Sequence, residues 1–508
     1  HQPATEPGNP DIVYAQWQQG NLNRVDKTTG EKVYIQPQSA AGEAPERHNW
    51  DAPILVSPHK ATRLYFGSQR LWKSEDRGDS WVAISGDLSR NQERLQLPIM
   101  GSTQSWDMPW DVLAMSNYNT LTSVSESPLK EGLIYAGTDD GLIQITENGG
   151  ESWQEIEVSK LPGVPETAFV NDIKADLHEV DSVYIALDNH KYGDYQPYLY
   201  KSNNRGKTWK KITQGLPEKT LVWRVVQDHV KKELIFAGTE FGLYVSFTGG
   251  QKWLEINGNM PTISIRDLAI QKRENDLVAA TFGRGFYVLD DYSFLRNVND
   301  NQLNHQATLF DSRDAWWYFP QQVLGDDEKA AQGDGFYTAK NPEFGAIFTY
   351  HLKDELKSKE KIRQDEEKES IKQKKSVSVG SWDQLEAERN EVGPNIWLVV
   401  KDNTGHVVRR VKGTTNKGFN QVAWDLTYPD LINVDKKGED DKEPSGFLST
   451  PGSYTVTLVK QQNGEFTDLS EAKGFNVKQL RKGSLDAVEP KELVAFWTKL
   501  SGLQRDLD

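Results

Sequence analysis

The residues of this chain that could carry out chemistry are carboxylates and arginines in short turns. Asp139 and Glu240 occupy the same place in two copies of one segment, Ala-Gly-Thr-Asp-Asp-Gly and Ala-Gly-Thr-Glu-Phe-Gly. Glycoside hydrolysis needs two carboxyl groups roughly 5 to 10 Å apart across the scissile bond. Because Asp139 and Asp140 are adjacent, only one of them is expected to face a shared cavity. Asp139 paired with Glu240 from a different repeat is therefore the best candidate for a catalytic pair.

Other polar residues of the same turns could hold a ligand. Guanidinium groups recognise carboxylates and hydroxyls well, because their N–H donors form a planar fork. Such a ring of groups favours a carbohydrate or peptide site, and the alternative is that the acids and arginines pair with each other between neighbouring repeats. The candidate ligand-binding residues are Asp140, His190, Asp194, Arg224, Arg266 and Arg284. The same face should carry Ser68, Gln69, Asn171, Asp172, Asp188, Trp223 and Asp267.

Four copies of one turn motif indicate which elements position these residues. Each copy has a hydroxyl residue, then Asp or Asn, Gly, a second hydroxyl residue and Trp, as in residues 74–81. Asp or Asn bonds its own backbone, Gly supplies a positive φ, and Trp anchors the returning strand in the core. The motif resembles the Asp-box, or bacterial neuraminidase repeat, and its fourth copy departs at Thr248 and Lys252. The predicted structural residues are Asp76, Gly78, Trp81, Asn148, Gly150, Trp153, Asn204, Gly206, Trp209, Gly250 and Trp253.

The repeating unit is longer than the turn. An apolar strand, a Gly-containing turn and another short strand precede the clearest boxes, so each unit reads as a whole antiparallel sheet. The boxes start at residues 74, 146, 202 and 246, which indicates a unit of about 45 residues with insertions. Four short strands per unit at this period are typical of propeller blades. A box turn joins the third and fourth strands of a blade, so the candidate site residues are expected at the opposite, top face.

Composition excludes several classes of site and partner. The chain has 508 residues and no cysteine, which excludes disulfides, thiol catalysis and Cys-ligated zinc. Its nine histidines form no local metal signature, and we expect neither a metal site nor a cofactor. A net charge of −15 disfavours nucleic acid as a partner. The sequence contains no apolar run of the length that a membrane-spanning helix needs.

The order of patterns along the chain predicts an all-β fold. The predicted regions are a sector of a seven-or-more-bladed Asp-box β-propeller at 1–297, a linker at 298–332, an immunoglobulin-like β-sandwich at 333–478 and the start of a helical segment at 479–508. A charged insertion is expected at 352–380 within the sandwich. Because the first unit begins in mid-blade and an open ring exposes sheet edges, we expect a missing N-terminal propeller half or a companion chain to close the ring.

Several segments together resemble one group of proteins. They are residues 49–59, 136–141, 237–242 and 280–285, and they look like the C-terminal half of large bacterial exported proteins of the sortilin-like or glycosyl-hydrolase-repeat type. The resemblance implies an Asp-box propeller followed by an immunoglobulin-like domain. It also implies export to the periplasm, the outer-membrane surface or the medium, with the signal peptide absent from this sequence.

Two functions follow from that resemblance. Sortilins bind peptides, which favours a binding or scaffold component for a protein, peptide or glycan within a larger envelope assembly. Xyloglucan-cleaving hydrolases are enzymes, so the alternative is a glycoside hydrolase or lyase with an acidic and arginine-rich site on the top face. Arg224, Arg266 and Arg284 are similar to the carboxylate-binding arginines of sialidases, but no Tyr and Glu nucleophile pair accompanies them.

Overall fold

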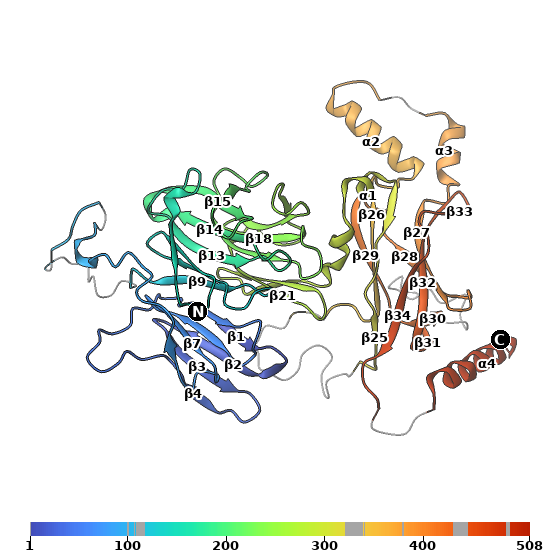
Figure 1. The fold of residues 1–508 in the computed structure, drawn as a ribbon. Helices are drawn as coiled ribbons and strands as arrows, with labels where there is room; N and C mark the ends of the chain where they lie inside the picture. Colours follow the sequence, from blue (N-terminus) through green and yellow to red (C-terminus); the bar gives the residue numbers. More distant parts are fainter. Residues whose placement is uncertain are drawn as a thin grey trace. The chain divides into compact units, whose positions relative to one another are not determined.

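The computed structural model describes residues 2–98, 101–105, 107, 117–320, 339, 341–377, 380–429, 445–483 and 488–507. The chain forms two compact units, His1–Asp290 and Asp291–Asp508. Figure 1 shows the first in blue to green and the second in yellow to red.

The first unit is a succession of antiparallel sheets, in which strands adjacent in sequence pair with each other. Blade 1 contains β1 (Pro3–Glu6), β2 (Asn9–Trp17), β3 (Asn21–Asp26) and β4 (Lys32–Tyr34); blade 2 contains β5 (Ile54–Val56), β6 (Leu64–Gly67), β7 (Leu71–Ser74) and β8 (Val82–Ala83); blade 3 contains β9 (Leu121–Glu126), β10 (Ile134–Thr138), β11 (Leu142–Thr146) and β12 (Gln154–Glu157). Blade 4 contains β13 (Phe169–Ala175), β14 (Val183–Asn189), β15 (Asp194–Ser202) and β16 (Lys210–Lys211); blade 5 contains β17 (Val222–Gln227), β18 (Ile235–Thr239), β19 (Gly242–Ser246) and β20 (Leu254–Ile256); blade 6 contains β21 (Ile265–Gln271), β22 (Asp276–Thr281) and β23 (Phe286–Leu289). The prediction of an Asp-box β-propeller is confirmed. The expectation that the first unit begins in mid-blade was wrong, because β1 already pairs with β2 and gives blade 1 four strands of its own.

Neighbouring blades pack face to face, with their first strands side by side. Strand β9 lies against β13, β13 against β17, and β17 against β21. Side chains on these strands also bond the backbone of the next blade. The hydroxyls of Ser123 and Ser125 accept from the N–H groups of Ile173 and Ala175, both at 3.0 Å. Such bonds satisfy buried polar groups that apolar packing would leave without partners.

The box turns have the predicted hydrogen bonds. In the first box, the Ser80 N–H and hydroxyl donate to Asp76 at 2.9 and 2.6 Å, and the Gly78 N–H donates to the Ser74 hydroxyl at 2.8 Å. These bonds stabilise the ionised carboxylate and lower the pKa of Asp76 to about 2. The altered fourth box still forms, because the Thr248 hydroxyl accepts the Lys252 N–H at 3.0 Å in place of an acid.

The box tryptophans reach beyond their own blades. Their indole N–H groups donate to a backbone carbonyl of the preceding blade: Trp81 to Ile35 at 2.7 Å, Trp153 to Ile84 at 3.2 Å and Trp253 to Ile212 at 2.7 Å. Trp253 is fully buried, whereas the other three box tryptophans are only partly buried. The buried Nε1 of Trp209 has no hydrogen-bond partner in the described part of the chain. The box tryptophan is therefore a tie between blades as well as a core anchor.

The second unit is a two-sheet β-sandwich. One sheet has the order β24 (Ala307–Leu309), β26 (Ala346–Leu352), β29 (Gly418–Trp424), and the other has the order β25 (Ala315–Trp317), β34 (Lys473–Gln479), β32 (Gly452–Gln462), β27 (Asn395–Asp402), β28 (Val407–Gly413), with β33 (Glu465–Asp468) also on β32. Phe348 of the first sheet and Leu398 and Val456 of the second belong to one buried cluster. A small sheet pairs β30 (Thr427–Pro429) with β31 (Ser445–Leu448).

Helices and short turns complete the chain. The segment 300–317, expected to be a linker, instead supplies α1 (Asp300–Asn304), β24 and β25 to the second unit, because the aromatic run there buries Trp317 in the core. The remainder of that expected linker, 321–332, lies outside the described residues. The charged insertion predicted at 352–380 contains α2 (Lys359–Lys372), and α3 (Trp382–Arg389) follows it. The C-terminal segment forms α4 (Pro490–Leu507). Short 3-10 helices are η1 (Arg94–Gln96), η3 (Val158–Lys160), η4 (His190–Tyr192) and η5 (Tyr292–Asn297).

The indole ties predict unequal costs for one substitution at two boxes. Trp253→Phe removes the donor to the Ile212 carbonyl and should lower the free energy of unfolding by about 1–3 kcal/mol more than Trp209→Phe, because Trp209 makes no such bond. Urea denaturation of both variants measures this difference. Equal losses would show that the indole hydrogen bond contributes nothing beyond ring packing.

The mouth of the propeller as the candidate functional site

The candidate site is the top face, at the end of the blades opposite the boxes. The turns between second and third strands lie there, together with the starts of the first strands, because strands alternate in direction within each blade. These turns place Tyr192, Phe241 and Phe282 at 63 %, 50 % and 74 % exposure. Large aromatic groups so exposed at one end of a fold are typical of binding surfaces.

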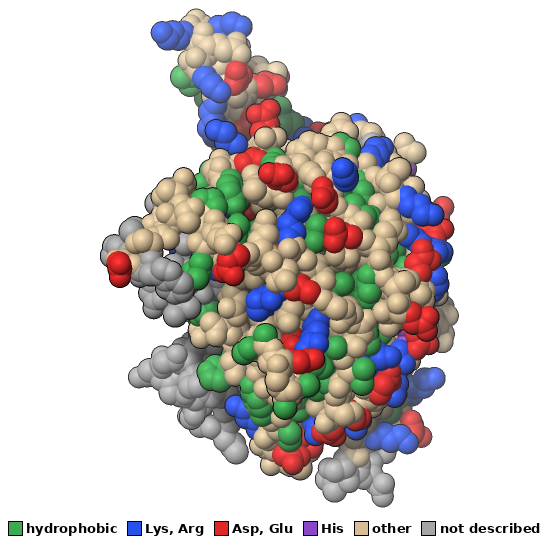
Figure 2. Space-filling model, turned by 60° about the vertical axis from the view of Figure 1, so that its left-hand side comes forward, with side chains coloured by type: hydrophobic (Ala, Val, Ile, Leu, Met, Phe, Trp, Pro, Cys, Tyr) green, Lys and Arg blue, Asp and Glu red, His purple; other side chains and the backbone are tan. Residues whose placement is uncertain are grey.

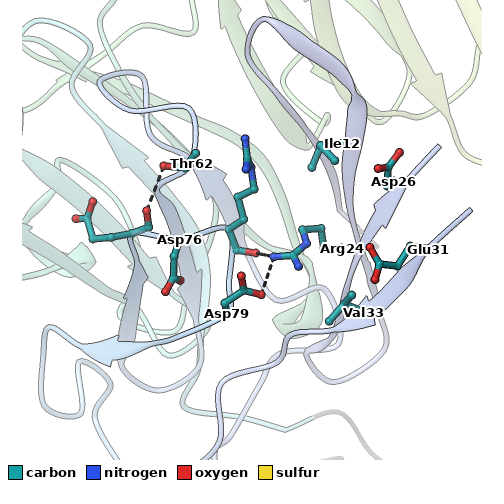
Figure 3. A pocket seen from close by; sticks show the side chains of 10 residues that line it. Ile12, Arg24, Asp26, Glu31, Val33, Thr62, Asp76 and Asp79 are labelled. Carbon is teal, nitrogen blue, oxygen red and sulfur yellow. Dashed lines mark hydrogen bonds and ion pairs between the residues drawn. The ribbon is translucent and has the colours of Figure 1, made fainter. Parts of the chain in front are cut away.

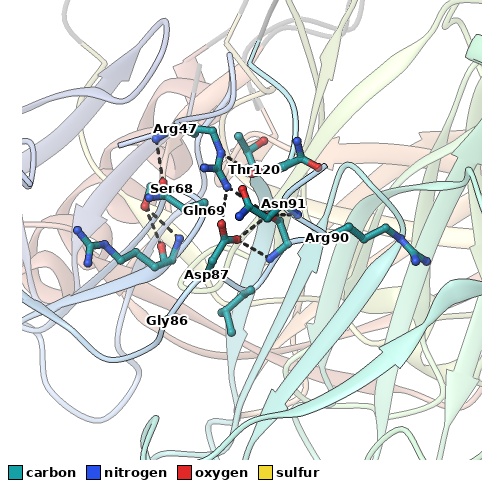
Figure 4. Close-up of polar contacts among 12 residues, drawn as sticks. Arg47, Ser68, Gln69, Gly86, Asp87, Arg90, Asn91 and Thr120 are labelled. Carbon is teal, nitrogen blue, oxygen red and sulfur yellow. Dashed lines mark hydrogen bonds and ion pairs between the residues drawn. The ribbon is translucent and has the colours of Figure 1, made fainter. Parts of the chain in front are cut away.

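The part of this face formed by blades 2 and 3 is occupied by its own polar contacts, which Figure 4 shows. The Arg47 guanidinium donates to Asp87 at 2.5 Å, and the Arg47 N–H donates to the Gln69 side chain at 2.8 Å. The Ser68 hydroxyl donates to Glu46 at 2.5 Å. Ser68 and Gln69, which the sequence placed on the top face, therefore hold neighbouring loops in position.

Asp139 and Asp140 belong to this same part of the top face, where polar side chains bond neighbouring loops. Asp139 is buried and accepts the Thr120 N–H at 2.8 Å, the Thr120 hydroxyl at 2.7 Å and the Asn49 amide at 3.3 Å. Burial raises the pKa of Asp139 to about 7, and the nearby Asp140 acts in the same direction. Asp140 is also buried and accepts the Arg90 N–H at 2.8 Å. Both carboxyls join a turn to a neighbouring segment.

Blade 4 contributes a histidine that a buried acid orients. His190 bonds the carboxylate of Asp188 through both its backbone N–H and its ring Nδ1. The His190 ring meets the Trp223 ring edge to face, with centroids 5.8 Å apart. Asp194 instead accepts the Tyr198 hydroxyl at 2.5 Å and the Gln196 N–H at 3.1 Å, so it stabilises the start of β15.

A β-bulge occurs near the start of the first strand in blades 3 to 6. The strand pairing skips Thr122, Asn171, Trp223 and Arg266. A bulge redirects the side chain of the extra residue. The Thr122 hydroxyl and the Asn171 amide donate to carbonyls of the next blade, at 2.6 Å to Val170 and 2.9 Å to Val222. Trp223 and Arg266 occupy the equivalent bulge positions in blades 5 and 6, where their side chains stack on each other.

The top-face turns and first-strand starts of blades 4 to 6 are called the mouth here. Trp223 and Arg266 lie at its centre. The Arg266 guanidinium lies 3.7 Å from the centroid of the Trp223 ring, a cation–π geometry. The Trp223 indole N–H donates to Glu240 at 2.9 Å, and the Ser264 hydroxyl donates to the same carboxylate oxygen at 3.0 Å. Glu240 is therefore held by blade 5 and blade 6 together.

The charge on Arg266 is influenced from several blades. Its pKa is lowered, chiefly because packing removes water from the guanidinium, and the neighbouring Arg224 adds repulsion. Glu240, Asp188 and Asp51 oppose that shift electrostatically. Asp51 precedes β5 of blade 2, so the mouth brings groups from blades 2, 4, 5 and 6 within electrostatic reach of one another. Within the described residues, the Arg266 guanidinium donates to no protein acceptor.

The other predicted arginines are placed differently. Arg224 lies 3.3 Å from Asp267 and donates to the carbonyls of Asn171 and Trp223, so it is already engaged by the protein. Arg284 lies exposed in the turn between β22 and β23. The structure thus gathers His190, Arg266 and Glu240 around Trp223, whereas Asp139 and Asp140 are held among the contacts of blades 2 and 3.

The sequence missed the exposed aromatic residues of the mouth. Phe241 and Phe282 each occupy a turn between second and third strands, at positions where a blade needs no core side chain. An aromatic residue in a tight polar turn was the available signal. Arg266 also lies 5.9 Å from the Phe282 ring, which links these rings to the central cluster.

Two further features of the described residues were compared with the top face, the surface charge and a cavity at the box end. On the face that Figure 2 shows, acidic and basic side chains are interspersed and leave no large patch of one sign. A cavity of about 460 Å³ lies at the box end between blades 1 and 2, lined by Arg24, Asp76 and Asp79 among others (Figure 3). Arg24 pairs with Asp79 at 2.8 Å, the other lining arginine, Arg77, pairs with Glu6 at 2.7 Å, and Asp76 belongs to the box turn. No group of three potential metal ligands occurs among the described residues, and none of their helices is long and apolar enough to cross a membrane.

The buried carboxyl of Asp139 predicts a pH-dependent stability. Because its pKa is raised in the folded protein, the unfolded chain loses this proton first as pH rises, and stability falls between about pH 4 and pH 7. Asp139→Asn removes this loss, so its free energy of unfolding should rise relative to the wild type by up to about 4 kcal/mol from pH 4 to pH 8. Urea denaturation at both pH values measures the effect, and a difference independent of pH would contradict it.

The comparison with protein families supports the Asp-box repeat. The BNR-Asp box repeat family model matches residues 199–212, which contain the third box. No curated protein matches the chain.

Similar solved structures include a GH74 enzyme from Niastella koreensis, with 14 % identity, a TM-score of 0.38, and coverage of 92 % of this chain and 64 % of that one. The GH74 xyloglucanase from Xanthomonas campestris shows 14 % identity, a TM-score of 0.41, and coverage of 92 % and 79 %. YCF48 from Cyanidioschyzon merolae shows 13 % identity, a TM-score of 0.36, and coverage of 61 % and 88 %. This chain spans just under two thirds of the Niastella enzyme, and at these TM-scores the likenesses carry no argument about activity. The blades and box turns of the chain itself identify its first unit as an Asp-box β-propeller.

Proposed function

We propose that this protein is an exported binding protein whose propeller mouth holds a segment of a peptide or protein. The observation that carries the proposal is the Arg266 guanidinium, stacked 3.7 Å over Trp223, with exposed aromatic rings beside it. Within the described residues, its N–H donors have no protein acceptor. Stacked arginine and exposed aromatic side chains are the groups enriched at energetic centres of protein interfaces.

The chemistry of the mouth favours a ligand with both carbonyl or carboxylate oxygens and an apolar side chain. Arg266 supplies a planar set of donors for such oxygens. Phe241 and Phe282 supply rings for an apolar group. Glu240 and the pair of Asp188 with His190 fix the surroundings of Trp223 through hydrogen bonds, which reduces the ordering cost on binding.

The second unit supports a scaffold role in the same proposal. A β-sandwich of immunoglobulin-like type would attach the propeller to a larger envelope assembly. Export is part of this proposal and follows from the resemblance to exported propeller proteins.

A glycoside hydrolase or lyase is the second candidate function. One observation favours it: the pKa of Asp139 is about 7, the range that a general acid needs. However, the described contacts of Asp139 occupy both carboxyl oxygens with Thr120 and Asn49, and the residue is only 4 % exposed. Glu240, its proposed partner, is bound by Trp223 and Ser264. The binding function therefore accounts better for these contacts.

A site-specific crosslink tests the binding function. A photoreactive phenylalanine analogue at Phe282, in protein expressed in the envelope of a Gram-negative host, should yield one defined protein or peptide adduct, identified by mass spectrometry. The same analogue at Val230, which is 59 % exposed at the box end of blade 5, is the matched control. Adducts of equal pattern at both positions would show that the mouth has no special affinity.

Substitution of Arg266 tests the role of the guanidinium. Arg266→Ala should reduce the yield of the Phe282 adduct at least about tenfold, as expected for truncation of a central interface arginine. Arg273→Ala is the control, because Arg273 is an exposed arginine at the opposite end of the same blade. An unchanged yield of the adduct would show that Arg266 does not contribute to ligand binding.

A polysaccharide assay separates the two candidate functions. The purified chain incubated with a panel of glucans, xyloglucan and sialylated glycans should release no new reducing ends. Turnover that Glu240→Gln abolishes would establish the enzyme instead. Glycan binding without turnover, lost in Arg266→Ala and with no protein adduct at Phe282, would show that the ligand is a carbohydrate.

A further inference from the structure

Trp223 positions a hydrogen-bond donor group and an acceptor group at the mouth. The Arg266 guanidinium lies 3.7 Å from the centroid of its ring, and within the described residues the guanidinium N–H groups have no protein acceptor. The indole N–H donates to Oε2 of Glu240 at 2.9 Å, and the Ser264 hydroxyl donates to the same oxygen at 3.0 Å. The second oxygen of Glu240, Oε1, accepts no hydrogen bond from any described residue. One indole therefore holds both an open donor and an open acceptor.

Both groups are accessible and already ordered. Arg266 is exposed and Glu240 is half-buried, whereas Trp223 between them in the contact network is buried. Two hydrogen bonds to one oxygen fix the direction of the Glu240 carboxylate, and stacking on a buried ring fixes the plane of the guanidinium. Groups that are ordered before binding lose little conformational entropy when a ligand arrives.

The charges around Arg266 disfavour a further anion. Glu240, Asp188 and Asp51 act on Arg266 as neighbouring negative charges, and Arg224 acts as a neighbouring positive charge. Arg224 is already paired with a carboxylate at 3.3 Å and donates to two backbone carbonyls. An anionic ligand at the guanidinium would therefore be repelled by three carboxylates, and the one other cation is engaged by the protein. Such repulsion is strongest where protein atoms exclude water.

A carboxylate and an amide place different demands on this site. A carboxylate offers acceptors only, so it could bond Arg266 but would leave Oε1 of Glu240 without a donor. It would also add a negative charge beside those already present. A backbone amide is neutral and offers one C=O acceptor and one N–H donor, which match the two open groups.

We infer that the mouth recognises a backbone amide inside its peptide ligand, with the amide C=O on Arg266 and an amide N–H on Glu240, and that it rejects a terminal carboxylate. The inference rests on the proposed peptide-binding function. An apolar side chain next to the amide would lie against Phe241 or Phe282. Arg266 lies 5.9 Å from the Phe282 ring, and Phe241 directly follows Glu240 in the chain, so an exposed ring adjoins each polar group.

Three small probes with the same apolar side chain test the inference on the purified 508-residue protein. They are N-acetylphenylalanine N-methylamide, the corresponding methyl ester and the free carboxylate. The amide should bind at least about threefold more tightly than the ester, which lacks the second N–H, and at least about tenfold more tightly than the carboxylate. Ligand-observed NMR titration at millimolar concentrations measures the three dissociation constants. A carboxylate or an ester that binds as tightly as the amide would overturn the inference.

Substitution of Glu240 tests the source of this preference. Glu240→Gln removes the negative charge and keeps an oxygen that can accept from Trp223, so it should raise the affinity for the carboxylate probe at least about threefold. Glu151→Gln is the matched control, because Glu151 is an exposed acid in a box turn at the opposite end of the blades. It should leave all three dissociation constants unchanged. A preference for the amide that Glu240→Gln does not reduce would overturn the inference.

Asp51→Asn provides a second variant in case Glu240→Gln does not fold, which circular dichroism would show. Asp51 is exposed, and its substitution removes a negative charge that acts on Arg266 without touching the contacts of Trp223. The affinity for the carboxylate probe should again rise relative to that for the amide. An unchanged ratio of the two affinities would count against the inference in the same way.

Arg266→Ala distinguishes failure of this inference from failure of the proposed function. It should weaken the binding of the amide probe, because the guanidinium supplies the donors for the amide C=O. Binding that depends on Arg266 but favours the carboxylate would overturn this inference and leave the peptide-binding function standing. Absence of any binding that depends on Arg266 would overturn both.

Discussion

The contact of a box tryptophan with the preceding blade is the interaction on which the propeller depends. A single blade buries only one face well, and its sheet gains stability when the next blade covers the other. The indole fixes the spacing of that packing, because its N–H group must reach a carbonyl while its ring fills the space between the sheets. In the fifth blade both requirements are met at once, since Trp253 is fully buried and its N–H lies 2.7 Å from the Ile212 carbonyl.

The box glycine serves the same interface. A Cβ on Gly250 would lie 2.6 Å from the Ile212 side chain, and one on Gly150 would lie 2.5 Å from the Ile84 carbonyl. Both glycines also have a positive φ. The residue type is thus required twice, by the turn itself and by the close approach of the neighbouring blade. This explains why glycine persists in the fourth box although the acid and the second hydroxyl residue have changed.

The mouth shows how one framework supports two kinds of surface. In blades 3 and 4 the bulged residues Thr122 and Asn171 bond the next blade and close the sheet ends together. In blades 5 and 6 the same positions carry Trp223, which is buried, and Arg266, which stacks on it and is exposed. The change of residue at a constant β-bulge thus replaces a hydrogen bond between blades with a cation–π stack. Around it, the acids of blades 2 and 3 remain engaged by their own loops.

The sequence by itself determined the local chemistry of this protein. The box residues dictate their turns through bonds over four residues, as between Asp76 and Ser80, and the repeat period dictates four-stranded blades. These are short-range effects, so composition and spacing suffice to predict them. The same is true of the top-face position of Asp139, Glu240 and Arg266, which follows from strand alternation.

Tertiary structure alone decided which of those residues are free to act. Whether a carboxylate already accepts hydrogen bonds within the protein depends on groups distant in sequence. Asn49 lies 90 residues from Asp139, and Ser264 lies 24 residues from Glu240. Bulges at Trp223 and Arg266 depend on strand pairing, which no local pattern encodes. The segment 300–317 shows the same limit, because its aromatic residues form strands only where the second unit provides a sheet and a core to receive them.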